Sequence, residues 1–263
     1  MYIIHSIDGT EIACRDAGRG SPTLMVHGIA SDGARWEPLL PMLTPRFKVY
    51  MIDRRGRGAS SDAPDYAIER EFEDVAAVID SIDQSVAVVG QGFGALCALE
   101  AARLSANVRK LVLFEPTLHT SGLEFYPNGA IARMEQLLSE GRLEETVSLF
   151  LREVMGASLY EMERMQQQVI WQHRLSAALT IPRELRALAR YSFDPSPFRR
   201  LGIPALVMVG GRSSDLVRRQ AKLVDDTLGI SQWVELAGQS GSAIDAVPGM
   251  FAREVVEFLR DIW

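Results

Sequence analysis

Short apolar runs alternate with longer amphipathic stretches along most of the chain. The apolar runs are rich in Val, Leu, Ile and Phe, which is typical of buried strands, and they lie at residues 22–26, 47–52, 86–89, 108–114, 204–209 and 232–236. Helical periodicity between them predicts helices at residues 34–43, 69–82, 93–104, 215–228 and 248–259. This alternation predicts an α/β fold with a mostly parallel central sheet and helices flanking both faces.

The pattern changes between residues 120 and 197, where helical stretches follow one another without a convincing strand. Pro and Gly mark both edges of this segment, in YPNG at residues 126–129 and in FDPSP at residues 193–197. The sequence therefore predicts a helical cap at residues 120–197, inserted after the strand at 108–114. Residues 1–119 and 198–263 would form the core.

The beginning of the chain alternates like a strand and has no basic segment followed by a long apolar run, so we expect no export signal. No apolar stretch is long enough to predict a membrane span. We expect a cytoplasmic protein, in which Cys14 and Cys97 are buried as small apolar side chains.

Composition narrows the class of partner. The 263 residues carry a net charge of -6, whereas a nucleic-acid site needs clustered positive charge, so nucleic acid is not expected as a partner. A hydrophobic content of 47% with 24% charged residues is ordinary for a globular protein. The sequence leaves the oligomeric state open, a homodimer included.

Three segments carry a family resemblance: LMVHG at 24–28, DRRGRGAS at 53–60 and GQGFGAL at 90–96. Their order and spacing resemble the α/β-hydrolase superfamily over nearly the whole chain, as do LVLFEP, PALVMVGG and LAGQSGSAID further on. The resemblance implies an oxyanion loop after the first segment and a nucleophile elbow, G-x-S-x-G, at the third. It also implies a catalytic triad of serine, histidine and acid.

The chain departs from that pattern at all three triad positions. Gly92 stands where the family has its serine, and Gly241 stands where the resemblance places the histidine. Arg212 stands at the expected acid position, with Asp215 three residues further on. Because glycine has no side chain, an acyl-enzyme cannot form at residue 92.

Other residues remain as candidates for chemistry. The backbone amides of Ile29 and Phe93 could still polarise a carbonyl group as an oxyanion hole. Glu115, after the strand at 108–114, is a candidate acid or base, as are His119 and His173. His27 belongs to the HG motif, which usually shapes the oxyanion loop in the family.

The remaining predicted site residues are expected to line an apolar pocket: Trp36, Gln91, Gly92, Tyr126, Trp171 and Gly241. No phosphate loop or dinucleotide fingerprint is present, since GQGFG does not have the third glycine at the spacing of G-x-G-x-x-G, so neither a cofactor nor a metal is expected. The predicted partner is an apolar small molecule.

Three functions follow from these observations. The first is a non-hydrolytic, cofactor-free cyclisation, elimination, decarboxylation or isomerisation of an apolar carbonyl compound in secondary-metabolite biosynthesis. It would rest on the orientation and polarisation of the substrate in the pocket, with one of the candidate acids or bases contributing. The second is a small-molecule binding or receptor protein that has lost the chemistry. The third is a hydrolase with displaced catalytic groups, for which Ser240 and Ser242 are the available nucleophiles.

Overall fold

An eight-stranded sheet with the order β1-β2-β4-β3-β5-β6-β7-β8 forms the centre of the computed structural model, which describes residues 1–119 and 127–260. The strands are β1 (Tyr2–His5), β2 (Glu11–Ala17), β3 (Ser21–Val26), β4 (Phe47–Ile52), β5 (Val86–Gln91), β6 (Val108–Phe114), β7 (Ala205–Gly210) and β8 (Ser231–Leu236). β1 and β2 form an antiparallel hairpin, and β2 pairs antiparallel with β4. β3 to β8 all pair in parallel. The predicted α/β fold with a mostly parallel sheet is confirmed.

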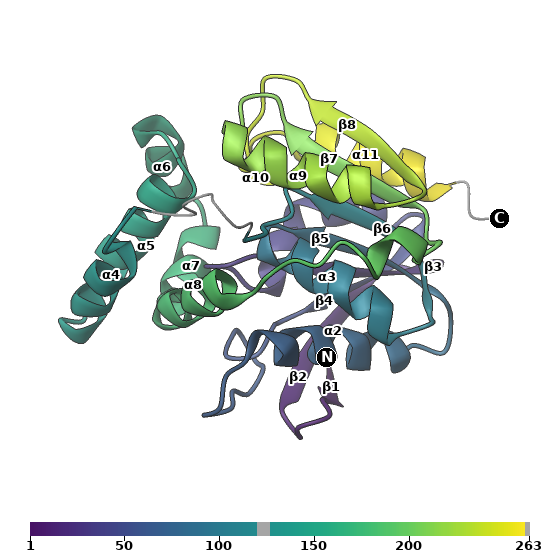
Figure 1. The fold of residues 1–263 in the computed structure, drawn as a ribbon, viewed down its shortest axis with the longest axis horizontal. Helices are drawn as coiled ribbons and strands as arrows, with labels where there is room; N and C mark the ends of the chain where they lie inside the picture. Colours follow the sequence, from purple (N-terminus) through teal and green to yellow (C-terminus); the bar gives the residue numbers. More distant parts are fainter. Residues whose placement is uncertain (120–126, 261–263) are drawn as a thin grey trace.

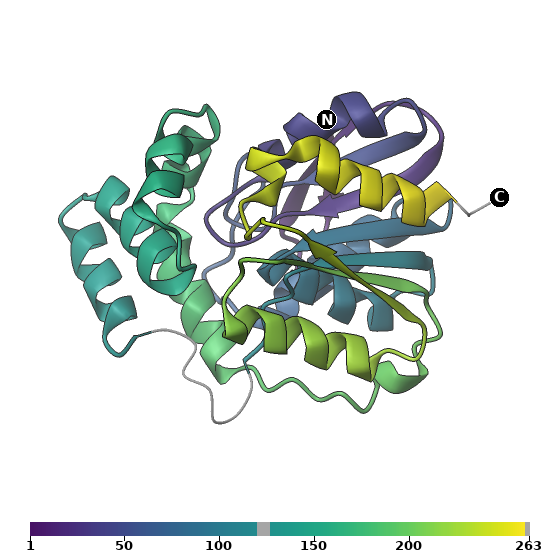
Figure 2. The ribbon, with the colours of Figure 1, turned by 90° about the horizontal axis from the view of Figure 1, so that it is seen from above.

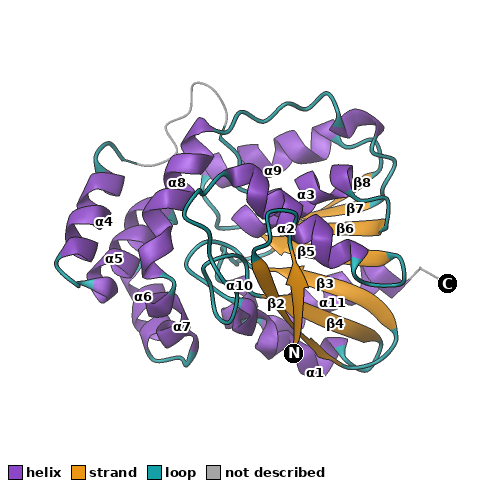
Figure 3. Cartoon of the chain, turned by 90° about the horizontal axis from the view of Figure 1, so that it is seen from below, coloured by secondary structure: helices purple, strands orange, loops and turns teal. Residues whose placement is uncertain are grey.

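Helices cover both faces of the sheet, because alternate side chains of each buried strand point to opposite sides (Figure 3). Leu24 and Val88 pack with the helices of one face, and Met25 and Val89 pack with those of the other. The first face carries α2 (Ile68–Asp80), α3 (Phe93–Leu104) and α9 (Asp215–Thr227), and the second carries η1 (Gly33–Leu39), α1 (Leu40–Leu43) and α11 (Pro248–Arg260).

One predicted helix is more irregular than its periodicity suggests. Residues 34–43 form a 3₁₀ helix, η1, followed by the single short turn of α1. Pro38 lies inside η1 and Pro41 lies at the start of α1. Because proline has no backbone N–H to donate, a continuous α-helix cannot form through these positions.

A group of helices between β6 and β7 stands at one end of the sheet (Figures 1 and 2). These cap helices are α4 (Ala130–Ser139), α5 (Leu143–Leu149), η2 (Phe150–Val154), α6 (Leu159–Gln166), α7 (Ile170–Ser176), η3 (Ala178–Thr180) and α8 (Ile181–Arg190). Two short helices, η4 (Phe198–Arg200) and α10 (Ala243–Ala246), complete the described chain. The exact boundaries of the cap remain a prediction.

The cap helices share a small apolar core that includes Met134, Phe150, Trp171 and Leu185. Ala30, from the loop after β3, packs into the same cluster. This contact joins the cap helices to the edge of the sheet at which its parallel strands end. Among the described helices, none has both the length and the apolar composition that crossing a membrane would require.

Candidate active site

A cavity of about 250 Å³ lies where the carboxyl ends of the parallel strands meet the cap helices. Three of its lining residues follow the strands: Gln91 ends β5, Glu115 comes directly after β6, and Gly241 lies in the loop after β8. Phe150 and Met165 contribute apolar surface from the cap helices. Ligands bind in α/β folds at this edge of the sheet, so the cavity is the candidate active site.

Gly92 occupies the sharp turn between β5 and α3. Its backbone angles are φ 57° and ψ -121°, a conformation that side-chain-bearing L-residues rarely adopt. Its N–H donates to the carbonyl of Phe114 at 2.9 Å, which ties the turn to β6. A Cβ at this position would meet only the hydroxyl of Thr117, at 3.5 Å, so there is open space above the turn.

Gly92→Ala should therefore lower the free energy of unfolding by about 1–3 kcal/mol, because the methyl group would fit but the backbone would be strained. Urea unfolding beside the wild type measures this difference. Gly229→Ala is a matched control: its Cβ would also have its nearest contact at 3.5 Å, but Gly229 does not have a positive φ. Equal midpoints for Gly92→Ala and the wild type would contradict a strained turn.

The loop after β3, which the family resemblance predicts to be the oxyanion loop, is held in place by hydrogen bonds of His27 and Arg54. The backbone N–H of Arg54 donates to Nε2 of His27 at 3.0 Å, so Nδ1 carries the ring proton and donates to the carbonyl of Gly28 at 2.9 Å. Arg54 donates from its guanidinium to the carbonyls of His27 and Gly28, each at 3.0 Å. With these carbonyls fixed, the Ile29 amide that follows them is positioned at the cavity wall. Phe93 begins α3, so its N–H has no acceptor within the helix.

Burial keeps His27 out of acid–base chemistry. The side chain is fully buried, and burial together with the charge of Arg54 lowers its pKa well below the ordinary value. The ring is therefore neutral at physiological pH. His27 therefore supports the loop after β3 through its two ring hydrogen bonds, and its predicted role as a binding residue stays a prediction.

Glu115 is the buried carboxyl group of the cavity. Its Oε1 accepts the N–H of Gly210 at 3.0 Å and the hydroxyl of Ser213. Burial raises the pKa of Glu115, although these two hydrogen bonds act in the opposite direction. The residue also has a positive φ of 49°, which turns the chain sharply as it leaves β6.

The second carboxyl oxygen of Glu115 lies against Gly241. A Cβ built on Gly241 would be 2.7 Å from Oε2 of Glu115, closer than real Cβ contacts allow. A histidine side chain at residue 241 would therefore displace the carboxyl group, which Gly210 and Ser213 hold in place. In this chain the carboxyl group of Glu115 takes up the space at the position where the family pattern has its base.

Glu161 of α6 connects the cap helices to the loop after β8. It accepts the hydroxyl of Ser240 at 2.7 Å and that of Ser242 at 3.2 Å. It also closes a capping box with Ser158 at the start of α6. These hydrogen bonds lower the pKa of Glu161 to about 2, against the effect of partial burial. The two serines considered as displaced nucleophiles thus have a carboxylate as their partner.

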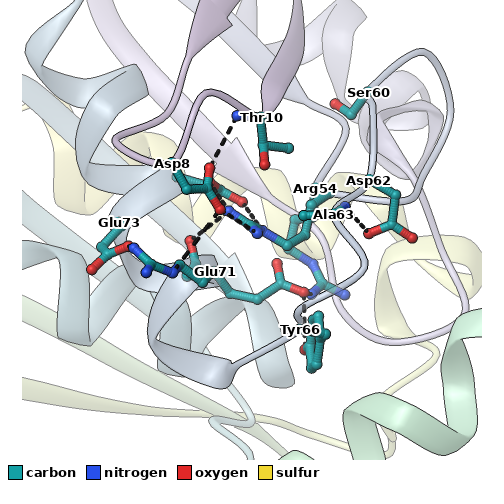
Figure 4. A network of polar contacts seen from close by, with 12 residues as sticks. Asp8, Thr10, Arg54, Ser60, Asp62, Ala63, Tyr66, Glu71 and Glu73 are labelled. Atoms are coloured by element: carbon teal, nitrogen blue, oxygen red, sulfur yellow. Dashed lines mark hydrogen bonds and ion pairs between the residues drawn. The ribbon is translucent and has the colours of Figure 1, made fainter.

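A buried ion network joins α8 to the sheet behind the oxyanion loop. Arg54 contacts Glu184 of α8 at 2.9 Å and Glu71 of α2 at 3.0 Å, and Arg57 contacts Glu184 at 2.5 Å. Glu71 also accepts the hydroxyl of Tyr66 at 3.1 Å, and Figure 4 shows Arg54 beside this pair. Both arginines and both glutamates are at most 2% exposed. The network fixes the guanidinium that orients the oxyanion loop.

The structure brings together half of the residues predicted for the site: Ile29, Gln91, Gly92, Phe93, Glu115 and Gly241 all line the cavity. Among the described residues, the lining does not include His27, Trp36, His119, Trp171 or His173. Tyr126 lies outside the described residues.

Three of the residues that do not line the cavity have other contacts. Trp36 is fully buried and packs near Phe251 on one face of the sheet, and Trp171 is buried in the apolar core of the cap helices. His173 lies 2.6 Å from a carboxylate oxygen of Asp32, so it links α7 to the start of η1. These side chains serve packing and cap attachment.

Several residues at the cavity were not predicted, among them Arg35, Glu161, Arg174 and Ser213. Only Glu161 has a readable local signal, because Ser158 and Glu161 form the S-x-x-E pattern of a capping box. That pattern identifies a helix start and says nothing about a cavity. The two arginines come from elements that are far apart in the sequence.

Comparisons with known proteins identify the family and the fold. The model of the α/β hydrolase family matches residues 23–253. The crystal structure of an α/β hydrolase from Sphaerobacter thermophilus superposes with a TM-score of 0.85 at 34% identity, covering 98% of this chain and 99% of that one. An enol-lactonase from Burkholderia xenovorans has the same fold, with a TM-score of 0.77 at 20% identity over 99% of this chain and 100% of that one.

Curated relatives match over shorter segments. The chain is 36% identical over 89 residues to a pimeloyl-[acyl-carrier protein] methyl ester esterase of Methylococcus capsulatus, which is 34% of either chain. It is 32% identical over 118 residues to an N-formylmaleamate deformylase of Pseudomonas putida, covering 43% of this chain and 44% of the relative. The chain thus spans less than half the length of these two relatives.

These named relatives are hydrolases, and this finding overturns the leading functional prediction made from the sequence. A cofactor-free cyclase, lyase or isomerase was inferred because the serine and histidine are absent from their expected positions. The absence of those side chains excludes an acyl-enzyme at residue 92, but it does not exclude hydrolysis. By its family model and its closely superposing solved relative, the chain belongs to the α/β hydrolase family.

Proposed function

We propose that this protein hydrolyses a small ester, lactone or amide with a water molecule as the nucleophile and Glu115 as the general base. The observation that carries the proposal is the position of the Glu115 carboxyl group, which lies against Gly241 and lines the same cavity as Gly92. The triad is replaced here: glycine at residue 92 leaves space for water, and a carboxylate takes the place of the histidine. Relatives named as an esterase and a deformylase support a hydrolytic reaction.

The reaction would proceed in two steps, and the substrate would at no point be bound covalently to the protein. Glu115 accepts a proton from the water above Gly92, and the water oxygen forms a bond to the carbonyl carbon of the substrate. The amides of Ile29 and Phe93 stabilise the oxyanion that forms. The carbonyl then re-forms, the bond to the leaving oxygen or nitrogen breaks, and Glu115 returns the proton to the leaving group.

The electrostatics of Glu115 suit this role. A carboxylate with an ordinary pKa is a weak base at neutral pH, and burial moves the pKa of Glu115 upward towards the working range. Ser213 and Gly210 hold Oε1, which leaves Oε2 for the water. Arg54 orients the oxyanion loop without lining the cavity, so it is a positioning residue.

The test separates attack by water from attack by a serine. Purified protein is incubated with small methyl esters and lactones, and acid release is followed at constant pH. We expect turnover without a burst and no protein adduct by mass spectrometry after treatment with a fluorophosphonate, which labels activated serines. The double variant Ser240→Ala/Ser242→Ala should still turn over. Labelling of Ser240 or Ser242, or a Glu115→Ala variant as active as the wild type, would refute the mechanism. Acid release no faster than without the protein would refute the function.

A further inference from the structure

Two buried arginines line the cavity and share one carboxylate. Arg35 of η1 is 2% exposed and Arg174 of α7 is 6% exposed. Asp245 of α10 forms an ion pair with Arg35, and its other oxygen lies 3.7 Å from Nη2 of Arg174. Two positive charges therefore face a single negative one.

Arg174 is the less satisfied of the two. Its Nη1 donates to the carbonyl of Ala30 at 3.3 Å, while its Nε is buried without a hydrogen-bond partner. Arg35 is better held, since its Nε also donates to Gln91 at 2.9 Å. A buried guanidinium with an unsatisfied N–H destabilises a fold, and a bound ligand with an acceptor oxygen would satisfy that N–H.

The other carboxyl groups nearby have partners of their own. Glu161 is held by Ser240 and Ser242, and Glu115 by Ser213 and Gly210. Asp32 accepts the N–H of Ala34 and contacts His173. Arg212, which also lines the cavity, is exposed and adds further positive charge. None of these carboxylates neutralises Arg174.

Burial and the neighbouring charge of Arg35 lower the pKa of Arg174 to about 10. The guanidinium still carries its proton at neutral pH. Its fixed fork of donors matches a carboxylate, which can accept two parallel hydrogen bonds from it.

We infer that the cavity binds the carboxylate of a small acid through Arg174, with Arg35 beside it. This inference rests on the proposed function and names its substrate class: an ester, lactone or amide that also carries a free carboxylate. The site adjoins the elbow, because Arg35 bonds Gln91, the residue before Gly92, and Gln91 bonds the carbonyl of Gly241 at 3.0 Å. An acid group anchored there would hold the reacting carbonyl in one orientation above Gly92.

The size of the cavity restricts the substrate further. A cavity of 150 Å³ holds one benzene molecule, so the 250 Å³ found here suit roughly ten non-hydrogen atoms. Apolar side chains such as Leu151 and Leu185 cover part of the lining. A short acid with a compact apolar body fits both features.

Calorimetric binding of two matched probes tests the inference without any turnover. 3-Phenylpropionate carries the carboxylate, and 3-phenylpropan-1-ol replaces it with a neutral hydroxyl. We expect the wild type to bind the acid at least tenfold more tightly than the alcohol. Arg174→Met should lose this preference at least tenfold and leave the affinity for the alcohol unchanged. Arg164→Met, on the exposed side of α6, is the control and should bind both probes like the wild type.

The unliganded proteins give a second readout. If Arg174 is kept for a ligand, Arg174→Met should melt no lower than the wild type, because methionine removes an incompletely paired buried charge. A lower melting temperature with unchanged acid binding would assign Arg174 a structural role and overturn the inference. Equal affinity of the wild type for acid and alcohol would also overturn it, and that comparison requires no variant.

The binding result and the hydrolysis result can fail separately. Hydrolysis of neutral esters with no preference for the acid probe would refute the carboxylate site alone. Tight acid binding with no hydrolysis of monomethyl succinate or other acidic esters would refute the proposed function and leave the carboxylate site standing.

Discussion

Glu115→Gln is expected to lower kcat/KM for ester hydrolysis by about 10²–10⁴-fold, the range that a positioned general base contributes. Glutamine keeps the size of the side chain and an oxygen that can accept from Gly210 and Ser213, so the fold and the cavity should persist. What it removes is the group that takes the proton from water. Glu163→Gln, an exposed position on α6, is the matched control and should leave the rate unchanged.

The pH dependence of the hydrolysis rate is a second test of Glu115 as the general base. Only the ionised carboxylate is a base, so the rate of the wild type should rise with pH through the raised pKa of Glu115 and then level off. The midpoint of this limb should lie above 4.5, the ordinary value for a glutamate, and the limb should vanish in Glu115→Gln. A wild-type rate independent of pH from 4 to 8, or a Glu115→Gln variant with full activity, would exclude this residue as the base.

Glu115→Gln should be more stable than the wild type at neutral pH, although it should be less active. Burial in the folded state raises the pKa of Glu115, so ionising this carboxyl group costs more in the folded protein than in the unfolded chain. The wild type therefore loses stability as pH rises through that pKa. A variant with an uncharged side chain at residue 115 does not. Glu115→Gln should therefore unfold at a higher urea concentration than the wild type at neutral pH. The difference should shrink as pH falls towards 4.5.

Glu184→Ala is expected to destabilise the protein by about 3–5 kcal/mol, the usual effect of breaking a buried ion pair by removing one partner. Glu184 is fully buried, and Arg54 and Arg57 lower its pKa against the effect of burial. Without Glu184, the two buried guanidiniums would have only the carboxyl group of Glu71 beside them. Burial raises the pKa of Glu71 to about 7. The midpoint and slope of urea unfolding measure the change.

Glu144→Ala is the matched control for that prediction, because it removes an exposed glutamate from α5, another of the cap helices. Substitutions at exposed positions usually change stability little, so this control should stay within about 0.5 kcal/mol of the wild type. A similarly small change for Glu184→Ala would mean that the network adds no net stability and that water reaches the arginines.

The sheet could be predicted because its signal is local. Each buried strand is a short apolar run, and the turn at Gly92 is encoded by the glycines of residues 90–94 between β5 and α3. The position of Glu115 at the cavity could be predicted for the same reason, since it directly follows β6 and must lie at the carboxyl edge of the sheet.

The cap side of the site could not be predicted in this way. An α-helix turns by about 100° per residue, so His173 and Arg174 point in different directions although they are adjacent. His173 lies against Asp32, while Arg174 lines the cavity. Which of the two faces inward depends on how α7 packs against a loop more than a hundred residues away in sequence. No periodicity within α7 contains that information.

The functional prediction was wrong for a chemical reason. Hydrolysis was tied to a serine at residue 92 and a histidine at residue 241, so their absence was interpreted as the loss of hydrolysis. Two glycines also create space, and the sequence does not reveal that the carboxyl group of Glu115 reaches the second of these spaces. The distance between Glu115 and Gly241 depends on the loop after β8, which only the folded chain defines.

The buried network of Arg54, Arg57, Glu71 and Glu184 also limits how this protein can diverge. Glu184 belongs to α8, one of the cap helices, whereas Arg54 and Arg57 lie in the loop after β4 and Glu71 lies in α2. A chimera that receives its cap from a relative would leave two guanidiniums in a dry interface unless the new cap brings a carboxylate to the same place. We therefore expect such a chimera to be less stable than this chain unless that carboxylate is supplied with the new cap.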